Sequence, residues 1–138
     1  MLERVALSPL GPGGYSSFGE IPAHKLGRTL RGKLYKVAGT LEETEKDNLI
    51  SRLKHAATTV TASLASGFGE GTFRAGVSRA LESRGALYAI QDHLQQLADE
   101  GMLNEEQFSE LRGETDAVLL AVNEYLGQLV KHKNIRKD

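Results

Sequence analysis

Apolar and small side chains recur every three or four residues through the middle of the chain, which is the spacing of one face of an α-helix. Gly67, Gly69 and Gly71 interrupt this pattern, and a helix interior disfavours glycine. The pattern therefore predicts two helices joined by a turn at residues 70–72. The series before the turn is Leu49, Leu53, Ala57, Val60, Leu64 and Phe68, and the series after it, which slips near Arg84, is Val77, Leu81, Leu87, Ile90, Leu94 and Leu97.

Two further helices are predicted on either side of this helical hairpin. The first begins near Pro22, which suits a first helical turn, and ends by Gly39. Four helices joined by short loops predict an all-α fold, an up-and-down antiparallel four-helix bundle. The apolar stripe of the first helix is Leu26, Leu30, Leu34 and Val37, and that of the last helix is Phe108, Leu111, Val118, Val122, Tyr125 and Leu129.

Capping residues mark where three of these helices begin. Thr40 with Glu43 forms a capping box that would open the second helix, and Asn104 with Gln107 forms another that would open the fourth. Thr72 is placed to cap the third helix after the glycine cluster.

Two clusters admit a ligand-binding interpretation. The glycine cluster could be a phosphate-binding loop, but it lacks a preceding strand and a Gly-Lys-Ser/Thr end, and Glu70 stands where a phosphate would lie. We therefore expect a helix end followed by a helix start. An acidic run could be a metal site, but negative charge near a helix start interacts favourably with the helix dipole. This run is Glu42, Glu43, Glu45 and Asp47.

The first twenty residues differ in composition from the rest. Proline, glycine and serine cluster there, which predicts an irregular arm over residues 1–20 with no regular element. The arm also contains Tyr15 and Phe18. Two interpretations stay open, a flexible arm with incidental apolar residues and an arm that docks into a groove on a partner subunit. The bundle domain is predicted over residues 21–134 and a basic tail over residues 135–138.

Two segments of the hairpin resemble the signatures of a known family. Residues 53–57 read Leu-Lys-His-Ala-Ala and residues 63–69 read Ser-Leu-Ala-Ser-Gly-Phe-Gly, which is similar to Leu-Arg-Arg-Ala-Ala followed by Asn-Ile-Ala-Glu-Gly-Phe-Gly. Residues 83–90 read Ser-Arg-Gly-Ala-Leu-Tyr-Ala-Ile, which is similar to Ser-Arg-Gly-Ser-Leu-Tyr-Glu-Leu. A weaker likeness at residues 34–36, Leu-Tyr-Lys, extends the match over most of residues 24–130.

These signatures are those of the small four helix bundle protein family, whose founding members are encoded by intervening sequences within bacterial 23S rRNA genes. The accessory variability proteins of diversity-generating retroelements are similar. The resemblance implies a homo-oligomer, typically a ring-shaped pentamer, and RNA, DNA or a reverse transcriptase as partners. The family's asparagine is Ser63 here, and its two acidic positions are Ser66 and Ala89, so no role of those carboxylates carries over.

Composition narrows the function classes. The chain has 138 residues and a net charge of −1, which fits one domain and argues against a wholesale polyanion binder. The absence of cysteine excludes disulfides and thiolate metal sites. No apolar run approaches the length of a membrane span, so we expect a cytoplasmic protein without a membrane partner.

Nothing in the sequence points to catalysis. The histidines are scattered singly, and none has a glutamate three residues before it, as carboxylate-bridged di-iron bundles require. No His-Glu-x-x-His motif occurs, and the chain lacks a thiol nucleophile. We therefore expect no enzymatic activity, no cofactor and no metal. The histidines are His24, His55, His93 and His132.

Basic residues form the candidate nucleic-acid-binding site. From Ile21 to Leu41 the chain contains no acidic residue. A charge run of this kind is either a solvated face or a surface that contacts phosphates. The second interpretation makes the candidate site residues Lys25, Arg28, Arg31, Lys33 and Lys36, with Arg74, Lys131 and Lys133 added from later helices.

The last helix carries more apolar residues than one bundle core needs. This excess predicts a second buried face against another subunit, with Leu119, Leu126 and Val130 as interface residues. Two hypotheses of function follow. One is a non-catalytic nucleic-acid-binding accessory protein that acts with RNA or a reverse transcriptase. The other is a structural or protein-interaction module with no nucleic-acid role.

Overall fold

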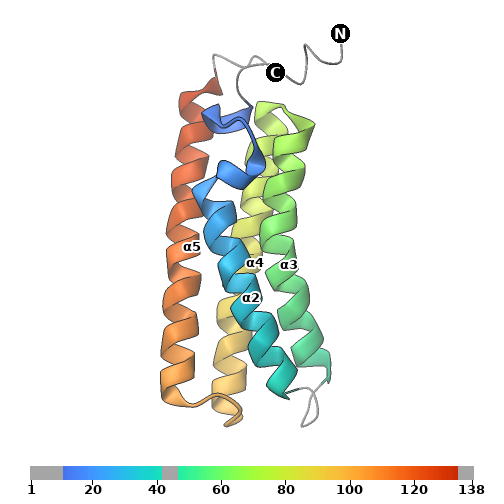
Figure 1. The fold of residues 1–138 in the computed structure, drawn as a ribbon, viewed down its shortest axis with the longest axis vertical. Coiled ribbons are helices and arrows are strands. Elements are labelled where there is room, and N and C mark those ends of the chain that lie inside the picture. Colours follow the sequence, from blue (N-terminus) through green and yellow to red (C-terminus); the bar gives the residue numbers. More distant parts are fainter. Residues whose placement is uncertain (1–10, 42–46, 134–138) are drawn as a thin grey trace.

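The computed structural model describes residues 11–41 and 47–133 (Figure 1). This part of the chain contains four α-helices and no strand, which confirms the predicted all-α class. The elements are the 3₁₀ turns η1 (Pro12–Gly14) and η2 (Phe18–Glu20), followed by α2 (Pro22–Leu41), α3 (Asp47–Glu70), α4 (Phe73–Asp99) and α5 (Glu105–Lys131).

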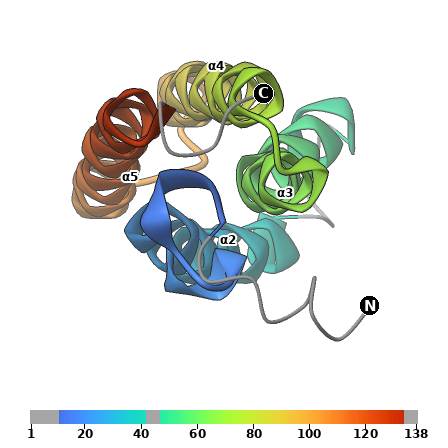
Figure 2. The ribbon, with the colours of Figure 1, turned by 90° about the horizontal axis from the view of Figure 1, so that it is seen from above.

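The four helices are arranged around a common centre in the view along the bundle (Figure 2), and their buried side chains form one apolar core. Each helix packs against two neighbours, because α2 contacts α3 and α5, and α4 contacts the same two helices. The start of α2, the end of α3, the start of α4 and the end of α5 lie together at what we term the upper end (Figure 1). None of the described helices is long and apolar enough to cross a bilayer.

Most of the predicted apolar stripes form the core, with two exceptions. The spacing predicts burial of Leu26 and Leu81, but each is 43% exposed. The buried position next to Leu26 is Gly27, where an added Cβ would lie 3.1 Å from Val60 and 3.2 Å from Thr61. The close approach of α3 to the α2 backbone therefore excludes a side chain there and turns Leu26 outward.

The slip in the α4 pattern also has a structural cause. Ala80 and Ser83 are buried where the apolar series breaks. The Ser83 hydroxyl donates to the main-chain carbonyl of Val60 over 2.9 Å, which satisfies a buried polar group and joins α4 to α3. A small hydroxyl residue is therefore a core residue at this position.

The predicted caps are confirmed at two helix starts. The side chain of Thr72 accepts a hydrogen bond from the Ala75 amide over 3.1 Å at the start of α4. Asn104 and Gln107 form the predicted capping box at the start of α5. Gly101, at a φ of 76°, follows the end of α4.

The glycine cluster agrees only in part with its prediction. Gly71 has a φ of 83° and follows the last residue of α3, as expected for a glycine that ends a helix. Gly67 and Gly69, however, lie inside α3. Gly67 is needed there because an added Cβ would lie 2.8 Å from the Arg79 Cβ, so the close contact between α3 and α4 selects glycine.

The prediction that Thr40 caps the second long helix is wrong. Thr40 lies inside α2, which continues to Leu41, and its hydroxyl donates to the Val37 carbonyl over 2.7 Å. A hydroxyl that bonds back to an earlier carbonyl is compatible with a helix, so the residue does not enforce a start. The next helix, α3, begins at Asp47. Glu42, Glu43 and Glu45 lie outside the described residues.

The described part of the N-terminal arm packs on the chain's own bundle. The Tyr15 hydroxyl donates to Gln128 Oε1 over 2.7 Å, and the Tyr15 ring lies 6.2 Å from that of Tyr125. Pro12 and Gly13 are buried there. The expectation of no regular element is wrong for residues 11–20, since two 3₁₀ turns form. Residues 1–10 and the predicted tail at residues 135–138 lie outside the described part.

Candidate nucleic-acid interface

Charge is distributed unevenly along the bundle in the described residues. Basic side chains outnumber acidic ones toward the upper end, and the reverse holds toward the lower end (Figure 1). The upper half carries the basic residues Lys25, Arg28, Arg31, Arg74, Arg79, Arg84, Lys131 and Lys133 against the acidic residues Glu20, Glu70, Glu82 and Glu124. The lower half carries Asp92, Asp99, Glu100, Glu105, Glu106, Glu110, Glu114 and Asp116 against Lys33, Lys36, Arg52, Lys54 and Arg112.

Three of the predicted residues line one open hollow on the outer side of α2. Lys25, Arg28 and Arg31 share it with Phe18 and with other residues of η2 and α2, namely Gly19, His24, Thr29 and Gly32. Lys25 and Arg28 are exposed and form no ion pair with any described residue. We term this site the α2 hollow.

Arg31 is held in place by the neighbouring helix. Its Nη1 donates to the Thr61 hydroxyl of α3 over 2.8 Å, and Thr61 is buried. A guanidinium has five N–H donors, so this bond fixes the position of Arg31 and leaves further donors for an anion.

His24 adds an imidazole ring to the α2 hollow. Its ring meets that of Phe18 edge to face, with 4.8 Å between centroids. Burial lowers the pKa of His24, and the charges of Arg31 and Arg28 lower it further. The imidazole is therefore neutral at pH 7, and the positive charge of the hollow comes from its lysine and arginines.

One carboxylate lies near this site. Glu20 accepts hydrogen bonds from the Ser16 amide over 3.0 Å and from the Ser16 hydroxyl over 2.9 Å. These bonds, with a smaller contribution from Lys25, lower the pKa of Glu20. Ser16 thus holds the Glu20 carboxylate, whose negative charge also interacts with Lys25 of the hollow.

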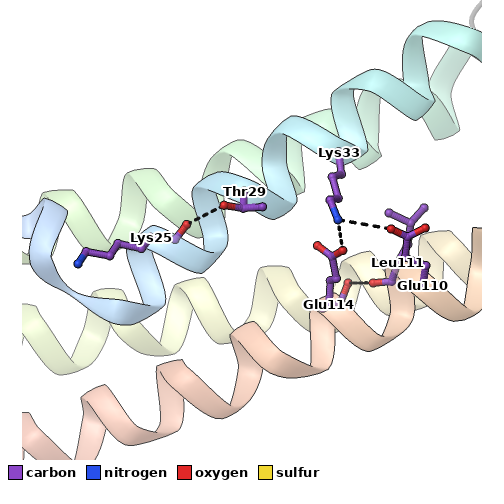
Figure 3. A network of polar contacts seen from close by, with 7 residues as sticks. Lys25, Thr29, Lys33, Glu110, Leu111 and Glu114 are labelled. Atoms are coloured by element: carbon purple, nitrogen blue, oxygen red, sulfur yellow. Dashed lines mark hydrogen bonds and ion pairs between the residues drawn. The ribbon is translucent and has the colours of Figure 1, made fainter.

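Lys33 does not belong to the same surface. Its Nζ lies 3.4 Å from Glu110 Oε2 and also bonds to Glu114, both on α5 (Figure 3). The bond to Glu114, followed by that to Glu110, raises the pKa of Lys33. The two carboxylates partly compensate the charge of this lysine, and Lys33 does not line the α2 hollow, so the structure does not bring it together with Lys25 and Arg28. Lys36 lines a separate hollow that also includes Glu110.

The predicted residues of α4 and α5 lie at the upper end and are not among the residues that line the α2 hollow. Arg74 is in the first turn of α4, and Lys131 is the last residue of α5. Lys133 follows α5, and its Nζ lies 4.9 Å from the centre of the Phe73 ring. The structure therefore brings these cations to one end of the bundle without joining them to Lys25 in one site.

The three predicted interface residues differ in what they offer a partner. Leu119 is only 8% exposed in the single chain, so the bundle itself buries it. Leu126 is partly buried against the core, whereas Val130 is 61% exposed. Sequence reasoning groups them because all lie beside the core stripe of one helix.

Phe18 and His24 are not among the predicted site residues. Phe18 lies in a glycine- and serine-rich segment without a regular pattern, and a single histidine carries little signal. Only the fold of η2 against α2 brings the two rings together. Within the described residues, no group of three or more histidine, aspartate or glutamate side chains is arranged to hold a metal ion.

These features define an all-α protein of four described helices with basic side chains concentrated at one end. The family model described as 23S rRNA-intervening sequence protein matches residues 20–124, and the chain belongs to this family. Comparison with curated proteins and with solved structures gave no match. The family assignment fits the resemblance found in the hairpin signatures.

Proposed function

We propose that this chain is a non-catalytic, homo-oligomeric nucleic-acid-binding accessory protein of the cytoplasm, with RNA or DNA as its ligand. The observation that carries the proposal is the α2 hollow, in which Lys25 and Arg28 are exposed and have no described acidic partner within ion-pair distance. Lysine and arginine in such a surface bind phosphates without reading sequence. A reverse transcriptase that uses the same RNA is the protein partner that the family resemblance adds.

Oligomerisation is part of this proposal because one hollow can bind few phosphates. In a closed ring, pentameric by family resemblance, the hollow repeats around the axis and several subunits act in one binding event. We assign the subunit interface to the exposed apolar residues at the upper part of α5, of which Val130 is 61% exposed. The ring then binds the nucleic acid more tightly than a single subunit does, although each chain contacts the same number of phosphates.

The proposal also includes an up-and-down antiparallel helix order. Side-chain pairs support it between α2 and α3, since Arg31 bonds to Thr61 and Tyr35 bonds to Thr58. The pairs between α4 and α5 follow the same descending order, with Arg84 bonded to Asn123 and Gln91 bonded to Asp116. In this order the basic residues near the start of α2, the start of α4 and the end of α5 all lie toward the upper end.

Charge reversal tests the proposal. A variant with Lys25→Glu and Arg28→Glu should lose binding to a labelled RNA at low salt in fluorescence anisotropy. Lys33→Gln is the control, because Glu110 and Glu114 already compensate Lys33. Equal RNA affinity of the reversed variant and the parent would exclude the α2 hollow as the binding surface.

A second function is favoured by a different observation. Tyr88, Leu120 and Val130 are 57%, 62% and 61% exposed, so each could contact a protein partner. These residues fit a structural or protein-interaction module whose basic residues only confer solubility. If the parent binds no RNA at low salt but remains oligomeric, this second function replaces the first.

A further inference from the structure

The α2 hollow contains an aromatic side chain as well as cations. Phe18 is 43% exposed, so part of its ring is open to a ligand. One contact of its ring is the edge-to-face contact with His24, at 4.8 Å between centroids. The Ile21 amide donates to the Phe18 carbonyl over 3.1 Å. This bond closes η2 and holds the Phe18 backbone, from which the side-chain ring extends. The ring is thus held at the edge of the hollow and still accessible.

Two glycines line the hollow and contribute no side chain to it. An added Cβ at Gly32 would meet no atom within 4 Å, and one at Gly19 would meet only the Ser17 hydroxyl oxygen at 3.9 Å. Gly32 lies inside α2, where glycine is less favourable than alanine. Packing within the chain does not require glycine at position 32. A side chain placed at position 32 would therefore extend into open space beside the residues that line the hollow.

His24 and the two arginines lie along the side of α2 that faces the hollow. His24, Arg28 and Arg31 follow one another at spacings of four and three residues, which places them on one helical face. They extend over about 10 Å at the helical rise of 1.5 Å per residue. An aromatic ring at one end and guanidinium groups along the helix match the two parts of a nucleotide, a flat base and a phosphate.

We propose that the α2 hollow binds a single-stranded segment of nucleic acid, with one unpaired base stacked on the Phe18 ring and the adjoining phosphates on Arg28 and Arg31. This inference rests on the proposed function and specifies its ligand. A base within a duplex is already stacked between its neighbours and is not available to a protein ring. The site therefore selects single strands, and it tolerates different sequences because every base has a flat face.

A single-tryptophan variant gives a direct test, because the chain contains no tryptophan. Phe18→Trp should bind a single-stranded RNA of about 12 nucleotides, within the usual site sizes for single strands, as the parent does. Its fluorescence should be quenched when a base stacks on the indole. Phe18→Leu should weaken that binding by about 5- to 100-fold, which is the usual effect of removing one stacking ring. A duplex of the same length should show neither effect.

Filling the hollow without changing its charge gives a second test. Gly32→Gln adds a good helix former in open space, so the fold should persist while single-stranded RNA binding falls. Gly39→Gln is the matched control, since Gly39 is another exposed glycine of α2 with no atom within 4 Å of an added Cβ and lies outside the hollow. The urea concentration at the midpoint of unfolding should be the same as or higher than that of the parent for both variants.

The outcomes separate this inference from the function on which it rests. Unquenched fluorescence together with parental RNA binding by Gly32→Gln would overturn base stacking. If Lys25→Glu with Arg28→Glu still abolished binding in that case, the proposed function would stand. Preference for duplex over single strands would also overturn the inference. An absence of any RNA binding by the parent would overturn both.

Discussion

Arg31 of α2 donates from Nη1 to the hydroxyl of Thr61 on α3, over 2.8 Å, and Thr61 is only 2% exposed. This bond gives Arg31 a structural role that its neighbour Arg28 lacks, although both line the same hollow. The bond also orients one guanidinium before any ligand arrives, which reduces the conformational entropy lost on binding.

Alanine substitutions at the two arginines should therefore lower the stability of the protein to different extents. Arg31→Ala removes a partner from a buried hydroxyl and should lower the free energy of unfolding by about 1 kcal/mol. Arg28→Ala should change it by less than about 0.5 kcal/mol, as is usual for an exposed residue. Urea denaturation followed by circular dichroism measures both values. Equal losses of stability in the two variants would show that the bond to Thr61 contributes nothing.

The glycines around the α3–α4 turn should respond differently to alanine. Gly71→Ala forces a side chain into a φ of 83° and should cost about 1 kcal/mol. Gly69→Ala should be neutral or stabilising by up to about 1 kcal/mol, because Gly69 is helical and open to solvent. Thermal unfolding of the two variants tests the difference. A larger loss for Gly69→Ala than for Gly71→Ala would contradict the observed helix end.

Stability should fall on mild acidification because two histidines have lowered pKa values. Burial is the main cause for both, reinforced by Arg31 and Arg28 at His24 and by Arg52 at His93, where Asp92 acts in the opposite direction. Each histidine binds a proton more readily in the unfolded chain, where the pKa of its imidazole is near 6.5. Stability is therefore complete above that pH and declines as pH falls from about 6.5 toward the folded-state values.

Removing one of these histidines should reduce the decline. His93 Nδ1 is buried without a hydrogen-bond partner among the described residues, so glutamine at this position removes a group that resists protonation. Urea midpoints measured at several pH values on either side of the ordinary histidine pKa should change less in His93→Gln than in the parent. His55→Gln, at an exposed position, is the matched control. Identical pH dependence in parent and His93→Gln would show that this histidine does not contribute.

Charged substitutions on α5 should distinguish the bundle core from a subunit interface. Leu119→Asp places an unpaired charge at a position that is 8% exposed in the single chain and should unfold the protein. Val130→Asp, at a position 61% exposed, should leave the helices intact and dissociate the oligomer. Leu126→Asp lies between these cases. Light scattering with circular dichroism measures both properties, and a monomeric parent would contradict the proposed interface.

Regular spacing predicts most of the fold from the sequence. The stripes of α3 and α5 and the caps at Thr72 and Asn104 depend on residues within one turn of each other, so local rules suffice. The burial of Gly27 could not be predicted, because it depends on how closely Val60 approaches from another helix. The same reason explains why the spacing places Leu26 wrongly in the core.

The candidate site is less accessible to sequence reasoning. The run of cations in α2 is visible in the sequence, but the Glu114 partner of Lys33 is 81 positions away. Phe18 could not be joined to Arg28 without knowing that η2 folds onto the start of α2. Sequence patterns thus identify which side chains carry charge, and only packing shows which charges are compensated.

The salt dependence of RNA binding tests the central claim most directly. For the parent, log affinity for a single strand should fall linearly with log salt, with a slope of about 0.7 for each phosphate neutralised. Lys25→Gln with Arg28→Gln should weaken binding and reduce this slope by about 0.7 for each phosphate that the assembly no longer neutralises. Arg52→Gln with Arg112→Gln removes two charges from the lower half and should leave the slope unchanged. Equal slopes for the parent and the Lys25/Arg28 variant would show that the α2 hollow does not bind phosphate.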